Sequence, residues 1–333
     1  AASPGLRPEV IELAAAALSV LALIGSGGVG GGLVLLALVA LSLARGLSSI
    51  ATKDVLGKTI SKQRRGTLMG WSGSVAGAVT LAAGAVLVLF DDRPGELALA
   101  VLLGVAALGW TLNALCAAAI EEAEGATDGG ANAWDSVKTG LALMRDDAAF
   151  RNFNLTRALL LSSALALPYV ALMAQDNGGT ELGGLGLLIV VSGVAGMVAS
   201  PIWGKRSDAS SKTVMRDGAI GTTLCCLLGA SLAWLPESMS ASVWPYALVY
   251  ALLVIVHSGI RLGRKTYIVD MAGADNRALY VALSNTITGV LMLIVGAVIG
   301  ALAQWLGAGP LLLVLAATAA LAALSALRLP EVE

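Results

Sequence analysis

Four ionisable side chains stand out among those inside long apolar runs of this sequence, where a charge is costly to bury. They are Arg45, Arg157, His257 and Arg261. Guanidinium groups bind carboxylate and phosphate groups through paired hydrogen bonds, and a histidine side chain titrates near neutral pH. These residue types indicate two kinds of chemistry, the binding of an anionic solute and the carriage of a proton.

Helical spacing groups these residues with other polar side chains. His257 lies one helical turn before Arg261, so the two share one face. Arg45 belongs to a polar stripe at intervals of three or four residues. The stripe consists of Ser42, Arg45, Ser49 and Thr52. We expect such faces to border a polar cavity rather than lipid.

Plainer interpretations of the same residues remain open. A long arginine side chain near the end of a membrane span can snorkel to the interface, which is an alternative for Arg157 and Arg261 and, to a lesser degree, for Arg45. A lone buried histidine is commonly a satisfied hydrogen-bonding group. This is the alternative to proton transport for His257.

The composition predicts the setting in which these residues lie. Apolar residues make up 57% of the 333 residues and charged residues only 13%, and the mean hydropathy is +0.83. Soluble domains have about 45–50% apolar and about 25% charged residues. We therefore predict an all-α membrane protein with several spans. A net charge of −1 gives no indication of a nucleic-acid partner, and three cysteines inside apolar runs indicate no disulfide framework.

Ten apolar runs are long enough to cross a bilayer, since a spanning helix needs about 20 mostly apolar residues. They are 9–28, 31–53, 68–90, 96–119, 154–174, 183–203, 214–235, 243–268, 279–305 and 308–328. When the loops are assigned alternately to two sides, every basic loop residue except Arg93 falls on one side. Basic loops mark the cytoplasmic side, so we expect a multi-pass inner-membrane protein with both ends of this chain in the cytoplasm.

One long loop, 120–152, divides four spans from six. It begins acidic and glycine-rich and then carries apolar residues at helical spacing. These are Trp134, Val137, Leu141 and Met144. The pattern predicts a short amphipathic helix on the cytoplasmic membrane surface. We therefore predict three parts, which are a four-span part in 1–119, a linker in 120–152 and a six-span part in 153–333.

An internal repeat relates the two parts. The segments RGLSSIATKD (45–54) and RLGRKTYIVD (261–270) both end an apolar run with an arginine nine residues before an aspartate. The two pairs are Arg45 with Asp54 and Arg261 with Asp270. A basic loop and a glycine-spaced span follow each pair, and the matching helices run in the same direction. Two parallel pseudo-repeats of this kind are typical of transporters.

The loop GKRSDASSK (204–212) resembles the signature G-x3-D-x3-[RK] of the major facilitator superfamily, with Gly204, Asp208 and Lys212 at its fixed positions. Ser211 stands where a glycine is usual. The motifs RRG (64–66) and NRA (276–278) resemble the basic ends of other loops of the family. The resemblance implies a bundle of twelve helices, of which this chain contains the last four of the N-terminal half and all six of the C-terminal half. We accordingly expect an N-terminally truncated chain that lacks the first two helices.

The resemblance also implies where substrate binds. In this family the first, fourth, seventh and tenth helices line a central cavity. Arg45 and Ser49 then fall on the fourth helix, Arg157 on the seventh, and His257 and Arg261 on the tenth. We expect these five residues to bind substrate.

The signature loop is expected to latch the two halves together on the cytoplasmic side. The expected gating residues are Gly204, Asp208, Lys212, Asp54 and Asp270. A charge cluster that only sets the membrane topology is the alternative for this loop.

These expectations together describe a secondary active transporter that moves a small solute by alternating access. The solute is expected to be anionic or carboxylate-bearing, with proton coupling, and we expect no cofactor or metal. A drug or metabolite efflux pump of the same fold stays open, although GSVAGAVTLAAG (73–84) lacks the proline of the antiporter motif. A non-transporting scaffold or sensor also stays open. A membrane enzyme is the least supported, because the chain has one histidine and no HExxH motif.

Overall fold

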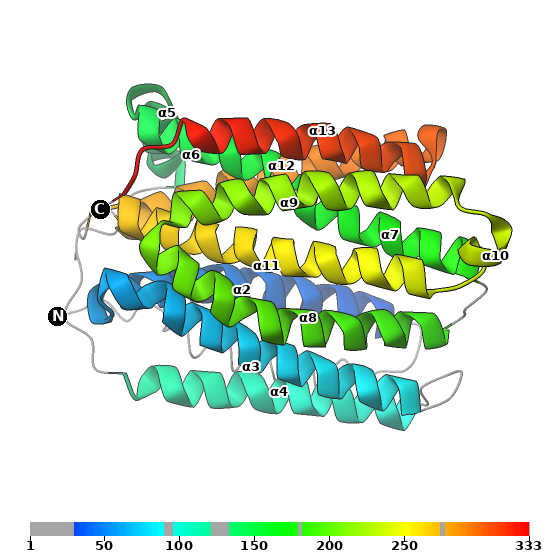
Figure 1. Cartoon of the computed structure of the whole chain (residues 1–333). Coiled ribbons are helices and arrows are strands. Elements are labelled where there is room, and N and C mark those ends of the chain that lie inside the picture. Colours follow the sequence, from blue (N-terminus) through cyan, green and yellow to red (C-terminus); the bar gives the residue numbers. More distant parts are fainter. Residues whose placement is uncertain (1–29, 90–95, 121–132, 179–181, 274–276, 333) are drawn as a thin grey trace. The chain divides into compact units, whose positions relative to one another are not determined.

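A computed structural model describes residues 30–89, 96–120, 133–178, 182–273 and 277–332, and all regular structure in these ranges is helical (Figure 1). This confirms the predicted all-α class. The first run, 9–28, lies outside the described residues. The long helices are rich in Leu, Ala, Val and Gly on all sides, as expected for helices surrounded by protein or lipid.

The helices follow the predicted runs closely. Their bounds are α2 Gly30–Thr59, α3 Lys62–Leu89, α4 Glu96–Ala118, α5 Ala133–Asp146, α6 Ala148–Leu159, α7 Ser162–Gly178, α8 Leu182–Ala209, α9 Ser211–Ser231, the 3-10 turn η1 Leu232–Trp234, α10 Glu237–Ser240, α11 Trp244–Met271, α12 Arg277–Leu306 and α13 Ala308–Leu327.

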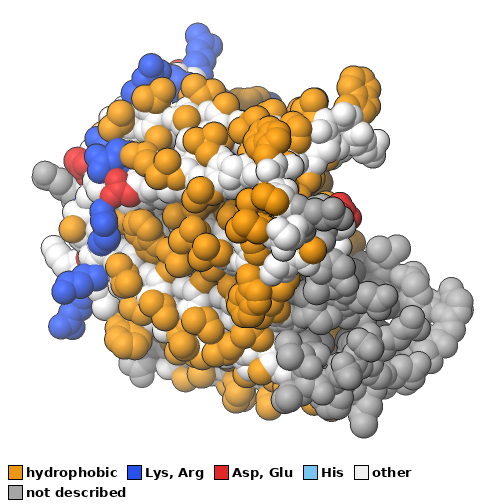
Figure 2. Space-filling model, turned by 45° about the vertical axis from the view of Figure 1, so that its right-hand side comes forward, with side chains coloured by type: hydrophobic (Ala, Val, Ile, Leu, Met, Phe, Trp, Pro, Cys, Tyr) orange, Lys and Arg blue, Asp and Glu red, His pale blue; other side chains and the backbone are white. Residues whose placement is uncertain are grey.

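Seven helical segments in the described residues are long and apolar enough to cross a membrane. They are 62–86, 148–176, 186–209, 211–234, 244–271, 277–306 and 308–327. Figure 2 shows hydrophobic side chains across the face that it presents, with Lys and Arg side chains gathered at one edge. Large exposed side chains such as Leu248 and Leu293, 63% and 78% exposed, suit contact with lipid. The total of ten spans stays a prediction.

The chain forms two compact units. The first contains α2 and α4, and the second contains α3 and α5 to α13. The predicted division into 1–119, 120–152 and 153–333 concerns the halves of the fold rather than this packing, and it stays a prediction. The amphipathic pattern of the linker falls on α5, while its location on a membrane surface also stays a prediction.

The core of the second unit lies among α7, α9, α11 and α13. Its buried side chains include Val170, Cys226, Leu253 and Leu312. Cys225 and Cys226 are adjacent, buried and free of disulfide bonds, as the sequence predicted. This core holds α11 in place, and α11 carries several of the polar residues discussed below, among them His257 and Asp270.

Glycines bring α3 and α8 into direct backbone contact. A Cβ atom added to Gly204 of α8 would lie 2.5 Å from the carbonyl oxygen of Gly66, and one added to Gly70 of α3 would lie 2.6 Å from the carbonyl oxygen of Ser200. Only glycine permits this approach. The contact fixes the end of α8 against the beginning of α3.

One predicted span is interrupted. The run 154–174 was expected to form one helix, but α6 ends at Leu159 and α7 begins at Ser162. The hydroxyl groups of Ser162 and Ser163 donate to the carbonyl oxygens of Leu159 and Leu160, at 2.9 and 2.8 Å. Such side-chain bonds compete with the backbone bonds of a helix and can bend it. The interruption places a polar turn inside an otherwise apolar span.

Candidate functional site

Arg157 lies on α6 and is held by polar side chains of α12. Its Nη1 atom donates to Ser284 Oγ at 2.7 Å, and its Nη2 atom donates to Asn285 Oδ1 at 2.9 Å. Ser284 in turn donates to Asn154 Oδ1 at 2.7 Å, and the Asn154 amide donates to the carbonyl oxygen of Phe150 at 2.9 Å. The guanidinium group is therefore fixed between two helices.

The acceptors of Arg157 are neutral, so its charge has no counter-ion in this network. Its Nε atom is buried and has no hydrogen-bond partner among the described residues. Within the described part of the chain, no carboxylate oxygen lies within 4.0 Å of the charged nitrogens of Arg157, Arg261 or Arg264. These three arginines thus form a group of like charges without an acidic partner there.

His257, Arg261 and Arg264 lie on one face of α11, because they are spaced by four and three residues. Arg264 interacts electrostatically with Arg157, with Arg261 and with His257. Arg261 is exposed in this structure and Arg264 is half-buried. We call these three arginines together with His257 the basic cluster.

His257 contacts the turn between α6 and α7, where the predicted span 154–174 is interrupted. Its Nδ1 atom lies 3.0 Å from Ser163 Oγ, and Ser163 also lies 2.8 Å from the carbonyl oxygen of Leu160. A carbonyl oxygen can only accept, so the single hydroxyl hydrogen of Ser163 serves Leu160 when that bond is formed. Nδ1 then donates to Ser163, and the lone pair of the neutral ring is on Nε2.

Arg45 and Ser49, also predicted to bind substrate, lie on α2 in the first unit. Their part in a common site stays a prediction. Asp54 likewise lies on α2, where its carboxylate pairs with Lys58 at 2.5 Å. The pair spans one helical turn.

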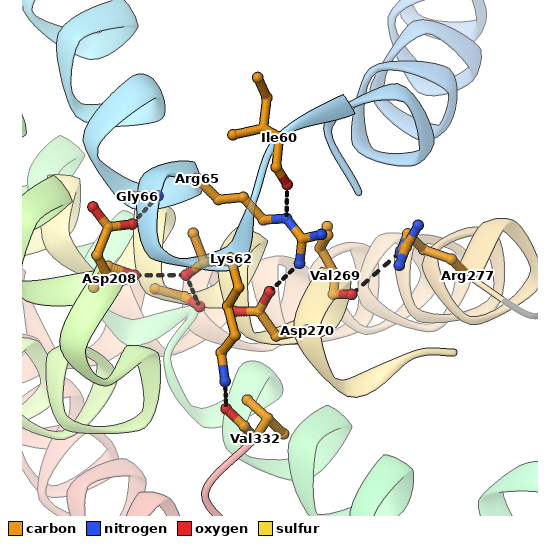
Figure 3. Close-up of polar contacts among 12 residues, drawn as sticks. Ile60, Lys62, Arg65, Gly66, Asp208, Val269, Asp270, Arg277 and Val332 are labelled. Atoms are coloured by element: carbon orange, nitrogen blue, oxygen red, sulfur yellow. Dashed lines mark hydrogen bonds and ion pairs between the residues drawn. The ribbon is translucent and has the colours of Figure 1, made fainter. Parts of the chain in front are cut away.

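Asp208 of the signature loop binds the beginning of α3 (Figure 3). Its Oδ1 atom accepts from the backbone N–H of Gly66 at 2.6 Å, and its Oδ2 atom accepts from the N–H of Thr67 at 2.9 Å and from the Thr67 hydroxyl. A carboxylate is favoured at the positive end of a helix dipole. The bonded atoms belong to segments 141 and 142 residues apart in the sequence.

A second tie joins α3 to α11. Arg65 Nη1 lies 2.6 Å from Asp270 Oδ1, and Arg65 Nε donates to the carbonyl oxygen of Ile60 at 3.0 Å. Figure 3 shows this ion pair beside the Asp208 contacts. In the same view, Arg277 at the start of α12 donates from Nε to the carbonyl oxygen of Val269 at 3.3 Å.

The last described residues cross the same end of the second unit. Lys62 donates to the carbonyl oxygen of Val332 (Figure 3), and Tyr267 Oη donates to the carbonyl oxygen of Pro330 at 2.9 Å. Glu331 accepts from Ser210 at 3.0 Å and lies 3.8 Å from Lys212. We call the contacts at this end the end network. It includes the predicted gating residues Gly204, Asp208, Lys212 and Asp270, whose role in gating stays a prediction.

Sequence reasoning did not select Arg264, Arg65 or Glu331 as site residues. Arg65 was noted only as part of the basic motif RRG (64–66) at the end of a loop. Its pairing with Asp270 could not be deduced from the spacing of residues. Arg264 was counted among the loop charges. Its place seven residues after His257 was the available signal.

A family model described as Major Facilitator Superfamily matches residues 154–333 of the chain. A search of curated protein sequences found no significant match.

Several solved structures are similar in fold. A bacterial homologue of the iron transporter ferroportin aligns with a TM-score of 0.67 and 16% identity over 97% of this chain and 81% of its own. The fucose:proton symporter FucP of E. coli aligns with a TM-score of 0.62 and 14% identity over 97% of this chain and 84% of its own. The human organic anion transporter MFSD10 (TETRAN) aligns with a TM-score of 0.60 and 14% identity over 96% and 77%, respectively.

Proposed function

This chain belongs to the Major Facilitator Superfamily, and from that premise we propose that it is a secondary active transporter that moves a small anionic solute by alternating access. The family and the fold of its structural neighbours support transport. The choice of an anion rests on the residues of this chain.

The observation that carries the proposal is the basic cluster. Arg157, Arg261 and Arg264 interact as like charges in a helical bundle, without a described carboxylate partner. Like charges that are brought together in a medium less polar than water repel one another. An anionic solute bound among them removes this repulsion and supplies the missing counter-charge.

The contacts of Arg157 argue against the alternative that its side chain snorkels to the membrane interface. A snorkelling side chain extends into the polar interface, whereas this guanidinium group donates to Ser284 and Asn285 on another helix. That geometry suits a side chain that is fixed before a ligand arrives, which lowers the entropic cost of binding.

Proton coupling is the finer part of the proposal, with His257 as the carrier. The contact with Ser163 favours a neutral ring whose lone pair is on Nε2. A proton bound at Nε2 adds positive charge to the basic cluster, and a bound anion offsets that charge. Anion and proton are therefore expected to favour each other's binding, as linkage requires.

The end network is proposed as the gate on the cytoplasmic side. Its two ties, from Arg65 to Asp270 and from Asp208 to the start of α3, connect α3 with α11 and α8. By the resemblance, α3 belongs to one half of the fold and α8 and α11 to the other. Alternating access would then require both ties to break when this end opens.

A binding experiment tests the anion proposal. The purified full-length protein is titrated with a panel of organic anions, each beside a neutral and a cationic analogue of similar size, and thermal unfolding is monitored. We expect stabilisation by anions alone, and a loss of affinity of at least about tenfold in Arg157→Gln, since a charge-assisted bond contributes about 1.5–3 kcal/mol. Arg145→Gln is the matched control, because that side chain is 89% exposed.

Transport is then measured in liposomes by counterflow of the anion that binds best. Stabilisation by the neutral or cationic analogues instead, or an Arg157→Gln protein that responds like its parent, would remove the basis for an anionic solute. The variant Arg45→Gln, in the same assay, reports whether α2 contributes to binding as the repeat predicts.

A further inference from the structure

We propose that the transported solute is a dianion, and that Arg264 selects it over solutes with one negative charge. The inference deepens the proposed function, because it rests on the basic cluster being the anion site. It names Arg264 as a specificity-determining residue, and it names a substrate class that carries two negative charges, as dicarboxylates and phosphate monoesters do.

Arg264 has a position that a purely structural role does not explain. It is half-buried, and no hydrogen bond or ion pair to it occurs among the described residues. By contrast, its neighbour Gly263 packs against α9. Thr266, two residues after Arg264, forms a hydrogen bond with Ser207. Arg264 interacts instead with the other cations of the cluster, where it raises the total charge that a ligand must offset.

The number of charges points to two negative groups. Arg157, Arg261 and Arg264 contribute three positive charges, while Ser284 and Asn285 satisfy hydrogen bonds of Arg157 without reducing its charge. A monoanion would leave two of these charges without compensation, and a dianion would leave only one. The charge of the exposed Arg261 can be compensated by water, so the charges that need a ligand are those of the half-buried Arg157 and Arg264, which a dianion offsets in full.

The arrangement of the arginines suits two anionic groups better than one. Arg157 is fixed on α6 by α12, and Arg261 and Arg264 stand on α11. The positive charge is therefore presented from two separate helices. Each guanidinium group can bind one carboxylate or phosphate group through paired hydrogen bonds, so a ligand with two charges can engage both helices together.

The test compares ligands that differ in charge and little in size. The probes are succinate, its half-amide succinamate and the diamide succinamide, together with a phosphate monoester and the corresponding diester. Affinities are measured by calorimetry on the purified full-length protein at a pH at which both carboxylates, or the phosphate, are fully ionised. We expect at least one dianion to bind at least about tenfold more tightly than its monoanion, and the diamide not to bind.

Arg264→Gln is expected to reduce this tenfold preference to less than about threefold while changing the affinity for the monoanion little. Arg264→Lys retains the charge and is expected to keep most of the preference, which a variant with a merely structural defect would not do. If Arg264→Gln fails to fold, the Arg264→Lys protein and the ratio measured in the parent still decide the question. Arg145→Gln is again the control.

The outcomes separate the two proposals. Equal binding of dianions and monoanions overturns the dianion inference and leaves an anion transporter. An equal loss for both probes in Arg264→Gln overturns the selective role of Arg264. Binding by none of the anions overturns the anion site itself, and the inference fails with it.

Discussion

The guanidinium group of Arg65 and the carboxylate of Asp270 lie 2.6 Å apart, with side chains that are only 11% and 5% exposed. This pair joins the beginning of α3 to the end of α11. The loss of one partner from a buried pair leaves a charge without compensation and costs about 3–5 kcal/mol. An exposed pair contributes about 0–1 kcal/mol. The location of the Arg65–Asp270 pair thus makes it the strongest single tie in the end network.

Asp270→Asn is therefore expected to lower the free energy of unfolding by about 2–4 kcal/mol, somewhat less than a full loss because asparagine still offers an acceptor to Arg65. Thermal unfolding of the purified protein measures this. The same substitution should change the transport rate if the pair belongs to the gate.

The control for this prediction is Arg206→Gln, whose side chain is 52% exposed in its pair with Asp217 and whose loss should cost less than about 1 kcal/mol. In the double variant with Arg65→Gln, the second substitution should add little to the first, because the interaction is already lost. Fully additive effects would show that Arg65 and Asp270 are not energetically coupled.

The close approach of α3 and α8 gives a second prediction. Gly70→Ala is expected to destabilise the protein by about 1–3 kcal/mol, because the new methyl group would overlap the backbone of Ser200 and Gly204. The same substitution at Gly289 of α12 meets no atom within 4 Å. There it should be neutral or stabilise by up to about 1 kcal/mol through helix propensity. Equal melting temperatures for the two variants would contradict the packing of these helices.

The helices, and the part played by Asp208 at one end of the second unit, could largely be predicted from the sequence. Apolar runs of bilayer length predict helices because a backbone in lipid must satisfy its hydrogen bonds internally. Asp208 was recognised because its loop resembles the family signature G-x3-D-x3-[RK]. The partners of Asp208, at Gly66 and Thr67, required the folded chain.

The basic cluster was predictable only in part. Arg157, His257 and Arg261 were found because a charge inside an apolar run is conspicuous. Arg264 was not, because it stands beside Lys265 near the end of the predicted run 243–268, where basic residues have the pattern of loop charges. The contacts of Arg157 with Ser284 and Asn285 join residues 127 and 128 positions apart, and no periodicity encodes such a pairing.

The segment that ends the chain supplies a third prediction. Tyr267 donates to the carbonyl oxygen of Pro330 at 2.9 Å, while its ring stacks on Phe153 with centroids 5.2 Å apart. Tyr267→Phe keeps the stacking and removes the hydrogen bond, at a cost of about 1 kcal/mol. Residues 329–332 should then open about fivefold more often, and trypsin should cleave after Arg328 correspondingly faster.

Mass spectrometry of a limited digest measures that cleavage. Tyr280→Phe is the matched control, because the Tyr280 hydroxyl donates to Asp147 at 2.8 Å and not to residues 329–332. If both variants are cleaved after Arg328 at the same rate as the parent, the bond to Pro330 does not hold this segment in place.

A fourth prediction uses Asn285 to neutralise the basic cluster from within. Asn285 Oδ1 accepts from Arg157 Nη2 at 2.9 Å, so Asn285→Asp would place a carboxylate where a neutral amide now stands, with nearly the same shape. The new ion pair compensates one buried charge, and the protein should be at least as stable as its parent.

The same pair competes with the solute for Arg157, so affinity for anions should fall at least about tenfold, or about 1.4 kcal/mol. Asn152→Asp adds the same charge on α6 at a residue that makes no hydrogen bond to Arg157 in the described part of the chain, and it should bind anions like the parent. A variant that gains stability but keeps full anion affinity would show that Arg157 is a structural cation and that the solute binds elsewhere.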